Sequence, residues 1–237
     1  MANSAGAREI TVEITNISNA IYFTPLLVAA HDRDTHLFQL GQPASDALRL
    51  MAEEGDNSEL VQQIETVEGV FDANPAGGLL EPGASATAEL ELDGKRTSRL
   101  SITAMLLPTN DGFVGLDSFR IPRRSGTHTV FLRSYDAGTE ANDELITGSG
   151  APGVPGIPAD PGGNSGTGGT GLAGPDVNDT VHVHRNNVGD LDPTGGPSDL
   201  DAGIHRWSDP IARVVITVEK RDDDDDEDDD DDNGNDD

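Results

Sequence analysis

Short segments in which apolar and polar residues alternate are the feature that most restricts how this chain can fold. Residues 9–16 (EITVEITN) place Ile10, Val12 and Ile14 on one side and glutamate or threonine on the other. This period of two predicts a half-buried strand. Several such segments, separated by turn residues and without alternating strand and helix units, favour an all-β fold, an antiparallel β-sandwich.

Further strands are predicted wherever a short apolar or alternating run lies between turn signals. The segment 22–30 (YFTPLLVAA) contains Pro25, which favours a sheet edge because proline cannot donate a ladder hydrogen bond. The segment 211–219 (IARVVITVE) is the most strand-like and is apolar enough to be a central strand. The remaining predicted strands are 84–92, 99–107, 127–135 and the short 181–184, and short apolar segments lie at 69–72 and 113–116.

Two short helices are predicted as an insert between strands. In Ser45–Glu54 the apolar residues Leu48 and Met51 are three positions apart, and Ser45 is a suitable N-cap. The residues after Glu54 (GDN) end this helix, and Ser58–Glu65 is a second one with a predicted cap at Ser58.

Two low-complexity segments contribute little to a core. Between Gly148 and Pro175, 16 of 28 residues are glycine or proline, which predicts a flexible surface loop. The acidic run at the C-terminus is predicted to be disordered, because it cannot bury apolar surface. We therefore expect a disordered N-terminus at 1–7, one β-sandwich domain at 8–220 that includes the loop at 148–175, and a disordered tail at 221–237.

The charge distribution limits the environment and the partners of the protein. The formal net charge is −29; residues 222–237 hold 13 acids, and the remainder holds 31 acids against 15 basic residues, only two of which are lysines. Such an acidic, lysine-poor surface fits a halophilic source, because high salt screens self-repulsion. Nucleic acid is an unexpected partner, since binding of its backbone depends on lysine and arginine.

The composition also bears on compartment and topology. The chain has no cysteine, so it forms neither disulfides nor thiolate metal sites. No apolar run is long enough to predict a transmembrane segment, and the first ten residues lack an apolar signal core. The chain is therefore either not exported or has lost a signal peptide.

Two acidic loops flank the strand predicted at 127–135. One loop contains Asn110 and Asp111 in the sequence TNDG, and the other runs from Asp136 to Glu140 in the sequence DAGTE. Glycines follow the acids and permit tight loop backbones. Calcium takes carboxylate and carbonyl oxygens from such loops, so the two loops are predicted to meet and bind Ca²⁺.

The order of several motifs resembles the spondin domain, the N-terminal domain of F-spondin and mindin that is also found alone in prokaryotic proteins. The resemblance extends from about Ile10 to Lys220. Its most specific parts are DAGTE and the terminal PIARV strand. The other matching segments are ITVEITN, FTPLLVAAHD, LFQLGQPAS, LMAEEGD, LPTNDGFVGLDS and YDAGTEANDE.

The resemblance implies a C2-like antiparallel β-sandwich with Ca²⁺ held by acidic residues at one end. The positions that correspond to the family's metal ligands are Asp111, Asp136 and Glu140. Glu140 replaces the aspartate usual there, which keeps the charge and lengthens the side chain by one methylene. Gly112 stands where an aromatic residue is usual, a departure expected to loosen the loop. The matrix and receptor partners of the animal proteins do not transfer.

Other kinds of site fit the sequence less well. His182 and His184 share a strand face and would form a Zn²⁺ site if His205 converged with them, but strand histidines are more often structural. Acid pairs suited to a secreted glycoside hydrolase arise by chance in so acidic a chain, and few aromatic residues are present to stack sugars. Nucleotide-binding and serine-nucleophile motifs are absent from the sequence. Four further oxygen donors near the acidic loops, Asn110, Asp117, Asn142 and Asp143, are more often turn caps.

The sequence as a whole predicts a non-enzymatic, secreted or cell-surface calcium-binding module for adhesion. Its partner would be an extracellular protein, a glycan or a lipid head group. A self-assembling structural subunit of a surface structure and a secreted hydrolase remain as alternatives.

Overall fold

The structure is a computed structural model, and it describes residues 7–75, 77–93, 96–151, 153–172 and 179–219. The predicted acidic tail at 221–237 and residues 1–6 of the predicted disordered N-terminus lie outside the described residues. Ala7 already belongs to the first strand.

The described chain is predominantly β-structure, as predicted. Every ladder between its strands is antiparallel. The order along the sheet is β4-β3-β6-β7-β8-β10-β1-β5, with β2 paired to β6 and β9 paired to β8. The strands are β1 Ala7–Asn16, β2 Tyr22–Phe23, β3 Leu27–His31, β4 Val70–Ala73, β5 Ser85–Asp93, β6 Arg99–Leu107, β7 Gly112–Arg120, β8 Gly126–Asp136, β9 His182–Val183 and β10 Ala212–Val218.

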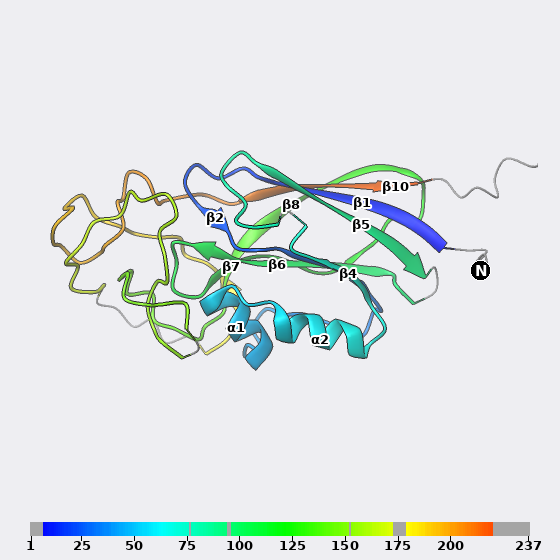
Figure 1. The fold of residues 1–237 in the computed structure, drawn as a ribbon, viewed down its shortest axis with the longest axis horizontal. Helices are drawn as coiled ribbons and strands as arrows, with labels where there is room; N and C mark the ends of the chain where they lie inside the picture. Colours follow the sequence, from blue (N-terminus) through cyan, green and yellow to red (C-terminus); the bar gives the residue numbers. More distant parts are fainter. Residues whose placement is uncertain (1–6, 76, 94–95, 152, 173–178, 220–237) are drawn as a thin grey trace, which may run out of the picture.

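The sheet folds into two layers (Figure 1), and β8 joins them. In the first layer β5, β1 and β10 lie side by side, and in the second β4, β6 and β7 face them. Residues 126–132 of β8 pair with β10, whereas residues 133–136 pair with β7. A single strand therefore passes from one layer to the other, and its last residue, Asp136, lies on the β7 side.

Strand β10 confirms the prediction that the last strand is central. It lies between β8 and β1, with Val12 opposite Ile216 and Ile10 opposite Val218. These side chains are buried in the main core between the layers. Burial on one face explains why β1 alternates so regularly, since its other face carries polar residues.

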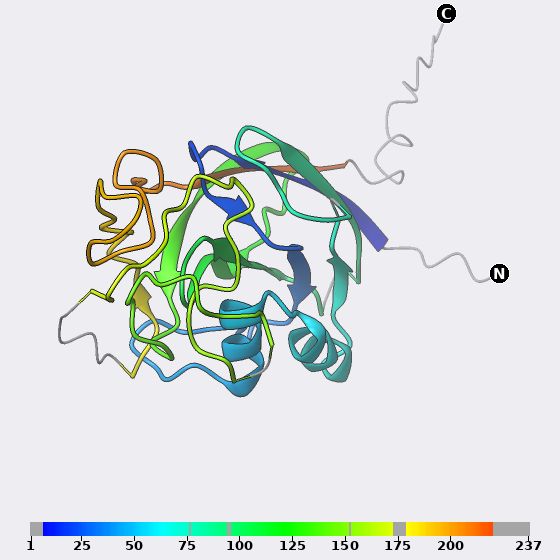
Figure 2. The ribbon, with the colours of Figure 1, turned by 60° about the vertical axis from the view of Figure 1, so that its left-hand side comes forward.

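Helices α1 (Asp46–Glu54) and α2 (Ser58–Thr66) cover the outer face of the second layer (Figure 2). Leu48 and Met51 of α1 pack with Leu60 and Ile64 of α2 in a second apolar cluster. Ser45 caps α1 as predicted, since its hydroxyl accepts from the Leu48 N–H at 3.1 Å.

The cap predicted at Ser58 is wrong. The N-cap of α2 is Asn57, whose side chain makes no capping bond and donates to the Pro25 carbonyl instead. The Ser58 N–H donates to the Asp56 carboxylate at 2.8 Å. The residue before the serine therefore stands at the N-cap, and neither Asn57 nor Ser58 supplies a side-chain cap.

Two other predicted segments differ in detail. The strand predicted at 22–30 is divided into β2 and β3 around Pro25. The described part of 148–175 contains neither helix nor strand, as predicted, but Ile157 within it is fully buried. The long segments between β8 and β10 gather at one end of the sandwich, the left-hand end in Figure 1.

Neither helix in the described part of the chain is long and apolar enough to cross a membrane.

Candidate metal centre

The start of β7 and the end of β8 place two aspartates side by side. Gly112, the first residue of β7, pairs with Asp136, the last residue of β8. Asp111 immediately precedes Gly112, and its carbonyl accepts from the Ala137 N–H at 3.2 Å. Both carboxylates are buried, with Asp111 0% and Asp136 1% exposed. The antiparallel pairing therefore brings together two acids that are 25 residues apart in the sequence.

The two oxygens of Asp111 have different surroundings. Oδ2 accepts from the backbone N–H groups of Thr139 at 2.8 Å and Glu140 at 3.0 Å, and from the Thr139 hydroxyl at 3.2 Å. Oδ1 is buried and has no hydrogen-bond partner among the described residues. A buried carboxylate oxygen without a partner is costly, because it loses water and gains nothing in exchange.

The electrostatics of the pair disfavour two negative charges. Burial, together with the neighbouring Asp136 carboxylate, raises the pKa of Asp111 to about 7. Burial removes the hydration that stabilises the ionised form, and the second carboxylate repels the charge. At neutral pH the pair therefore favours either a proton or a cation.

Asp136 is held by its own loop. Its Oδ1 accepts from the Gly138 N–H at 2.8 Å, and its Oδ2 accepts from the Asn142 amide at 2.7 Å. The His182 Nε2 lies 3.7 Å from the same Oδ2. The left-handed backbone at Gly138 (φ 71°) allows the chain to turn tightly enough for the first of these bonds.

Glu140 contributes differently from the two aspartates. Its backbone N–H donates to Asp111, but its carboxylate accepts from the Gly156 N–H at 3.0 Å. Burial raises the pKa of the Glu140 carboxyl. Within the described ranges, no group of three or more His, Cys, Asp or Glu side chains is placed to hold a metal ion. The fold therefore brings Asp111 and Asp136 together and binds the Glu140 carboxylate to the neighbouring loop.

Hydrogen bonds connect this pair to the long loops beyond it. Asn110 donates through its amide to the Asp143 carboxylate at 3.0 Å and accepts from the Glu144 N–H at 3.3 Å. The buried Glu144 carboxylate in turn accepts from the Val188 and Gly189 N–H groups at 2.5 and 2.8 Å. A continuous chain of contacts therefore runs from the β6–β7 loop to the segment before β10.

Asp117, the remaining oxygen donor noted in the sequence, is remote from this chain of contacts. It lies inside β7, and its carboxylate accepts from His36 and from the Leu37 backbone N–H.

The three histidines considered for Zn²⁺ have separate partners. His182 bonds to the Thr180 carbonyl, His184 packs against Trp207, and the Nδ1 of His205 accepts from the Asp201 N–H. They form no common metal-binding group in the part of the chain that the structure describes.

Comparison with known proteins identifies the family of the chain. Residues 15–147 match the protein family described as Spondin_N, more than half of the chain. The chain belongs to the Spondin_N family. The resemblance predicted from the motifs is thus confirmed.

Two curated relatives are similar to the chain over part of its length. Human Spondin-2 is 35% identical to the chain over 130 residues, and Spondin-2 of Rattus norvegicus is 33% identical over 130 residues. In each case the alignment covers 50% of this chain and 38% of the relative. The chain thus spans well under half the length of these relatives. The family match includes Asp111, Asp136 and Glu140 and ends before β9 and β10.

The glycine that departs from the pattern of the spondin family has a packing reason. A Cβ on Gly112 would lie 2.7 Å from the Thr109 Oγ1 and 2.9 Å from the His184 Cδ2. The Gly112 N–H also donates to the Thr109 hydroxyl at 3.0 Å. His184 therefore occupies the space beside Gly112, and the loop is closely packed at this point.

The residues of the pair suit a cation in some respects. Two buried carboxylates, one with an open oxygen, are the hard oxygen donors that Ca²⁺ prefers. The third donor expected from the family, Glu140, is committed to Gly156. Sequence reasoning named Asn142 as a nearby oxygen donor, but its amide N–H donates to Asp136 instead. The position of His182 beside Asp136 was not anticipated, since it is set by loop conformation.

Proposed function

We propose that this spondin-family chain is a non-enzymatic, secreted or cell-surface interaction module whose loop end is stabilised by Ca²⁺. The observation that carries the proposal is the buried Asp111 carboxylate, which lies beside Asp136 with one oxygen unpartnered. A divalent cation would remove the repulsion between the two charges and give that oxygen a partner.

Asp111 and Asp136 would hold the ion, and Glu140 would be its third protein ligand. When bound, Ca²⁺ supplies positive charge and a requirement for oxygen donors, and it takes part in no chemical reaction here. The chain's own part is to fix the two loops: Asp111 accepts from the backbone of residues 139 and 140, and Asn110 links to Asp143 and Glu144. Binding would therefore order the loop end as one unit.

The loop end is the proposed contact surface for an extracellular protein, a glycan or a lipid head group. It includes exposed apolar side chains, among them Leu191 at 82% and Val188 at 41% exposure. Glu144 anchors the segment that carries them through Val188 and Gly189. A cation that stabilises the Asp111 loop would thereby stabilise a surface able to bury apolar groups in a partner.

The test is a calorimetric titration of Ca²⁺ into chelator-treated protein, with thermal unfolding as a second readout. The acidic run at 222–237 offers many weak sites, so the titration is repeated on a chain that ends at Arg221. Both are repeated in high salt, in case the acidic fold requires it. Binding to the folded state stabilises it by about RT ln(1 + [L]/Kd), so saturating Ca²⁺ at 100 Kd raises the unfolding free energy by about 2.7 kcal/mol.

The variant Asp136→Asn keeps the shape of the side chain and removes one charge. We expect one saturable site in the wild-type chain and a loss of both binding and Ca²⁺-dependent stabilisation in this variant. Asp179→Asn, a neutralised acid outside the pair, is the matched control and should bind as the wild type does. Binding that survives Asp136→Asn, or a lack of binding in the shortened wild-type chain, would refute the calcium site.

A further inference from the structure

A second region of the molecule, on the side covered by the helices, contains a cavity of about 490 Å³. It lies between the segment 34–43 and the two helices, with Ser45 and Leu48 of the α1 region and Gln63 of α2 in its wall. None of the residues of the Asp111–Asp136 pair lines it. Its volume falls within the roughly 300–1,000 Å³ typical of small-molecule sites.

The walls of this cavity carry uncharged hydrogen-bonding groups. Gln39, Gln42, Gln63, Thr35 and Ser45 are among the residues that line it. Each amide supplies both donors and acceptors, and each hydroxyl does the same. Such a set is complementary to a ligand that itself carries several hydroxyl groups.

The apolar part of the lining comes from the second core cluster. Leu37, Phe38 and Leu48 contribute to the wall and are almost completely buried. Phe38 is fixed by Phe113 and Tyr135, with ring centroids 5.0 Å away in both cases. These fixed apolar residues support the polar residues of the lining and keep its shape constant.

The charges of the lining exclude some ligand classes. Neither lysine nor arginine is among the lining residues, and Asp34 is the one acid. Phosphates, sulfates and carboxylates are bound mainly by arginine, lysine or clustered backbone N–H groups. A neutral ligand therefore fits better than an anion.

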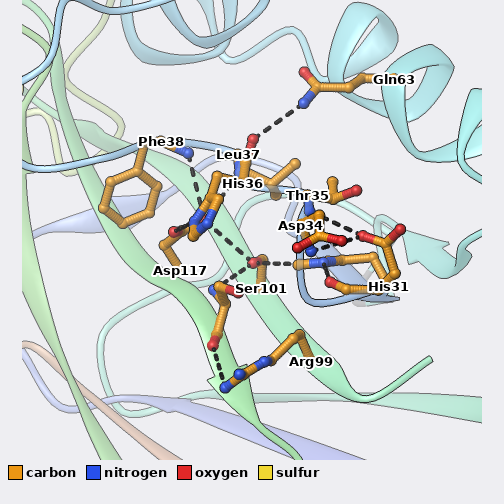
Figure 3. Close-up of polar contacts among 12 residues, drawn as sticks. His31, Asp34, Thr35, His36, Leu37, Phe38, Gln63, Arg99, Ser101 and Asp117 are labelled. Atoms are coloured by element: carbon orange, nitrogen blue, oxygen red, sulfur yellow. Dashed lines mark hydrogen bonds and ion pairs between the residues drawn. The ribbon is translucent and has the colours of Figure 1, made fainter. Parts of the chain in front are cut away.

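Hydrogen bonds hold the cavity in shape without a ligand, as Figure 3 shows. The Asp117 carboxylate of β7 accepts from the His36 Nδ1 at 2.5 Å and from the Leu37 N–H at 2.9 Å. The Gln63 amide donates to the His36 carbonyl at 3.0 Å, which connects the segment to α2. A site fixed in advance loses less conformational entropy when it binds a ligand.

His36 adds a directed group to this wall. Its imidazole is 36% exposed, and Asp117 accepts the Nδ1 proton. In the neutral ring the Nε2 is then an acceptor, and no described residue donates a hydrogen bond to it. A hydroxyl group of a bound ligand is a suitable donor to this nitrogen.

We propose that this cavity binds a neutral saccharide. The polar side chains of its lining would exchange hydrogen bonds with the sugar hydroxyls. The site is separate from the calcium pair, so the inference does not depend on the proposed function.

The experiment is saturation-transfer-difference NMR on the full chain with a panel of neutral sugars. The probes are the methyl glycosides of glucose, galactose, mannose and N-acetylglucosamine, together with maltose and cellobiose. Inorganic phosphate and 1-butanol serve as anionic and apolar comparisons. Each measurement is made with EDTA and again with Ca²⁺, which separates this site from the calcium pair.

Two cavity variants and one matched control identify the site. Gln42→Ala removes a lining side chain that is exposed, and Gln63→Ala removes the amide that joins α2 to His36. Gln62→Ala removes the neighbouring exposed amide of α2, which is outside the lining. We expect the Kd of a bound sugar to rise at least fivefold in both cavity variants and to stay within twofold in Gln62→Ala.

Gln42→Ala is the decisive variant, because it removes no hydrogen bond of the described fold that involves its side chain. Binding of at least one sugar that Gln42→Ala weakens, in EDTA as well as in Ca²⁺, supports the site. The proposal is overturned if none of the sugars binds at 50 mM, if binding is the same in Gln42→Ala, or if only phosphate or 1-butanol binds.

Discussion

Two aspartates near β7, six residues apart, have opposite surroundings. Asp117 has both carboxylate oxygens occupied, by the His36 imidazole and by the Leu37 N–H. Asp111 has one oxygen that accepts three hydrogen bonds and one that is buried without a partner. An aspartate therefore holds a neighbouring segment in place at position 117 and is a candidate metal ligand at position 111.

Acidity alone therefore does not identify a binding residue in this chain. The Asp117 carboxylate accepts hydrogen bonds at both oxygens from His36 and Leu37, so it fixes the segment that contains these residues. A buried carboxylate with an open oxygen next to a second carboxylate is unstable without a proton or a metal. The hydrogen-bond partners of each aspartate, rather than its place in an acidic motif, decide its role.

Removing the Asp117 carboxylate is expected to have the largest effect on stability. Asp117→Ala leaves the buried Leu37 N–H and the His36 Nδ1 without their acceptor. Loss of a charged acceptor for two donors should lower the unfolding free energy by about 2–4 kcal/mol. Urea unfolding measures this loss. Asp34→Ala, which removes a side chain that is 79% exposed, should cost less than about 0.5 kcal/mol. Equal losses of unfolding free energy in the two variants would mean that the Asp117 carboxylate does not hold the segment of His36 and Leu37 in place.

Filling the space beside Asp111 is expected to have the next largest effect. The Cβ of Gly112→Ala would lie too close to Thr109 and His184, so the loop must shift. Overpacking of this kind costs about 1–3 kcal/mol, and the Ca²⁺-dependent stabilisation should fall as well. Gly78→Ala is the control, because a Cβ there meets no atom within 4 Å. An unchanged unfolding free energy in Gly112→Ala would show that the β6–β7 loop can shift at little energetic cost.

The ionisation of Asp111 predicts a pH dependence in the absence of metal. The pKa of this acid is raised to about 7 in the folded chain, so the folded state holds the proton more tightly than the unfolded state does. The contribution of Asp111 to stability is therefore complete at about pH 4 and is lost as the pH rises through about 7.

The comparison with Asp111→Asn isolates this contribution. The unfolding free energy of the wild type in EDTA, minus that of Asp111→Asn, should decrease steadily between pH 4 and pH 8. The buried histidines, whose pKa values are lowered by burial, act in the opposite direction but cancel in this difference. A difference that does not vary with pH would contradict the strained Asp111–Asp136 pair.

The smallest effect is expected at Glu140. Its carboxylate accepts from Gly156 in the absence of metal, so part of any gain on binding Ca²⁺ is spent in breaking that bond. Glu140→Gln should therefore weaken Ca²⁺ binding by about tenfold or less, compared with the loss expected for Asp136→Asn. Calorimetry on the two variants under the same conditions gives the ratio. If Glu140→Gln abolishes binding, the ranking of the three acids is wrong.

The fold class and most of the elements could be predicted from the pattern of residues. Alternation in β1 and β10 predicted strands with one buried face, and Ser45 predicted the start of α1. Burial of one strand face requires apolar and polar residues to alternate, and this alternation can be read from the sequence. A helix cap involves only residues that are neighbours in the sequence. The family, too, followed from short motifs, and the match over residues 15–147 confirms it.

Which acids lie close together could not be predicted without the fold. Asp111 and Asp136 adjoin because Gly112 pairs with Asp136, whereas the Glu140 carboxylate bonds to Gly156 and Asp117 bonds to His36. Each of these partners is distant in the sequence or set by loop conformation. The residues next to an acid in the sequence therefore do not identify its hydrogen-bond partner. Hydrogen bonding and burial depend on how loops pack, and this is why the open oxygen of Asp111 and the cavity beside His36 became visible only in three dimensions.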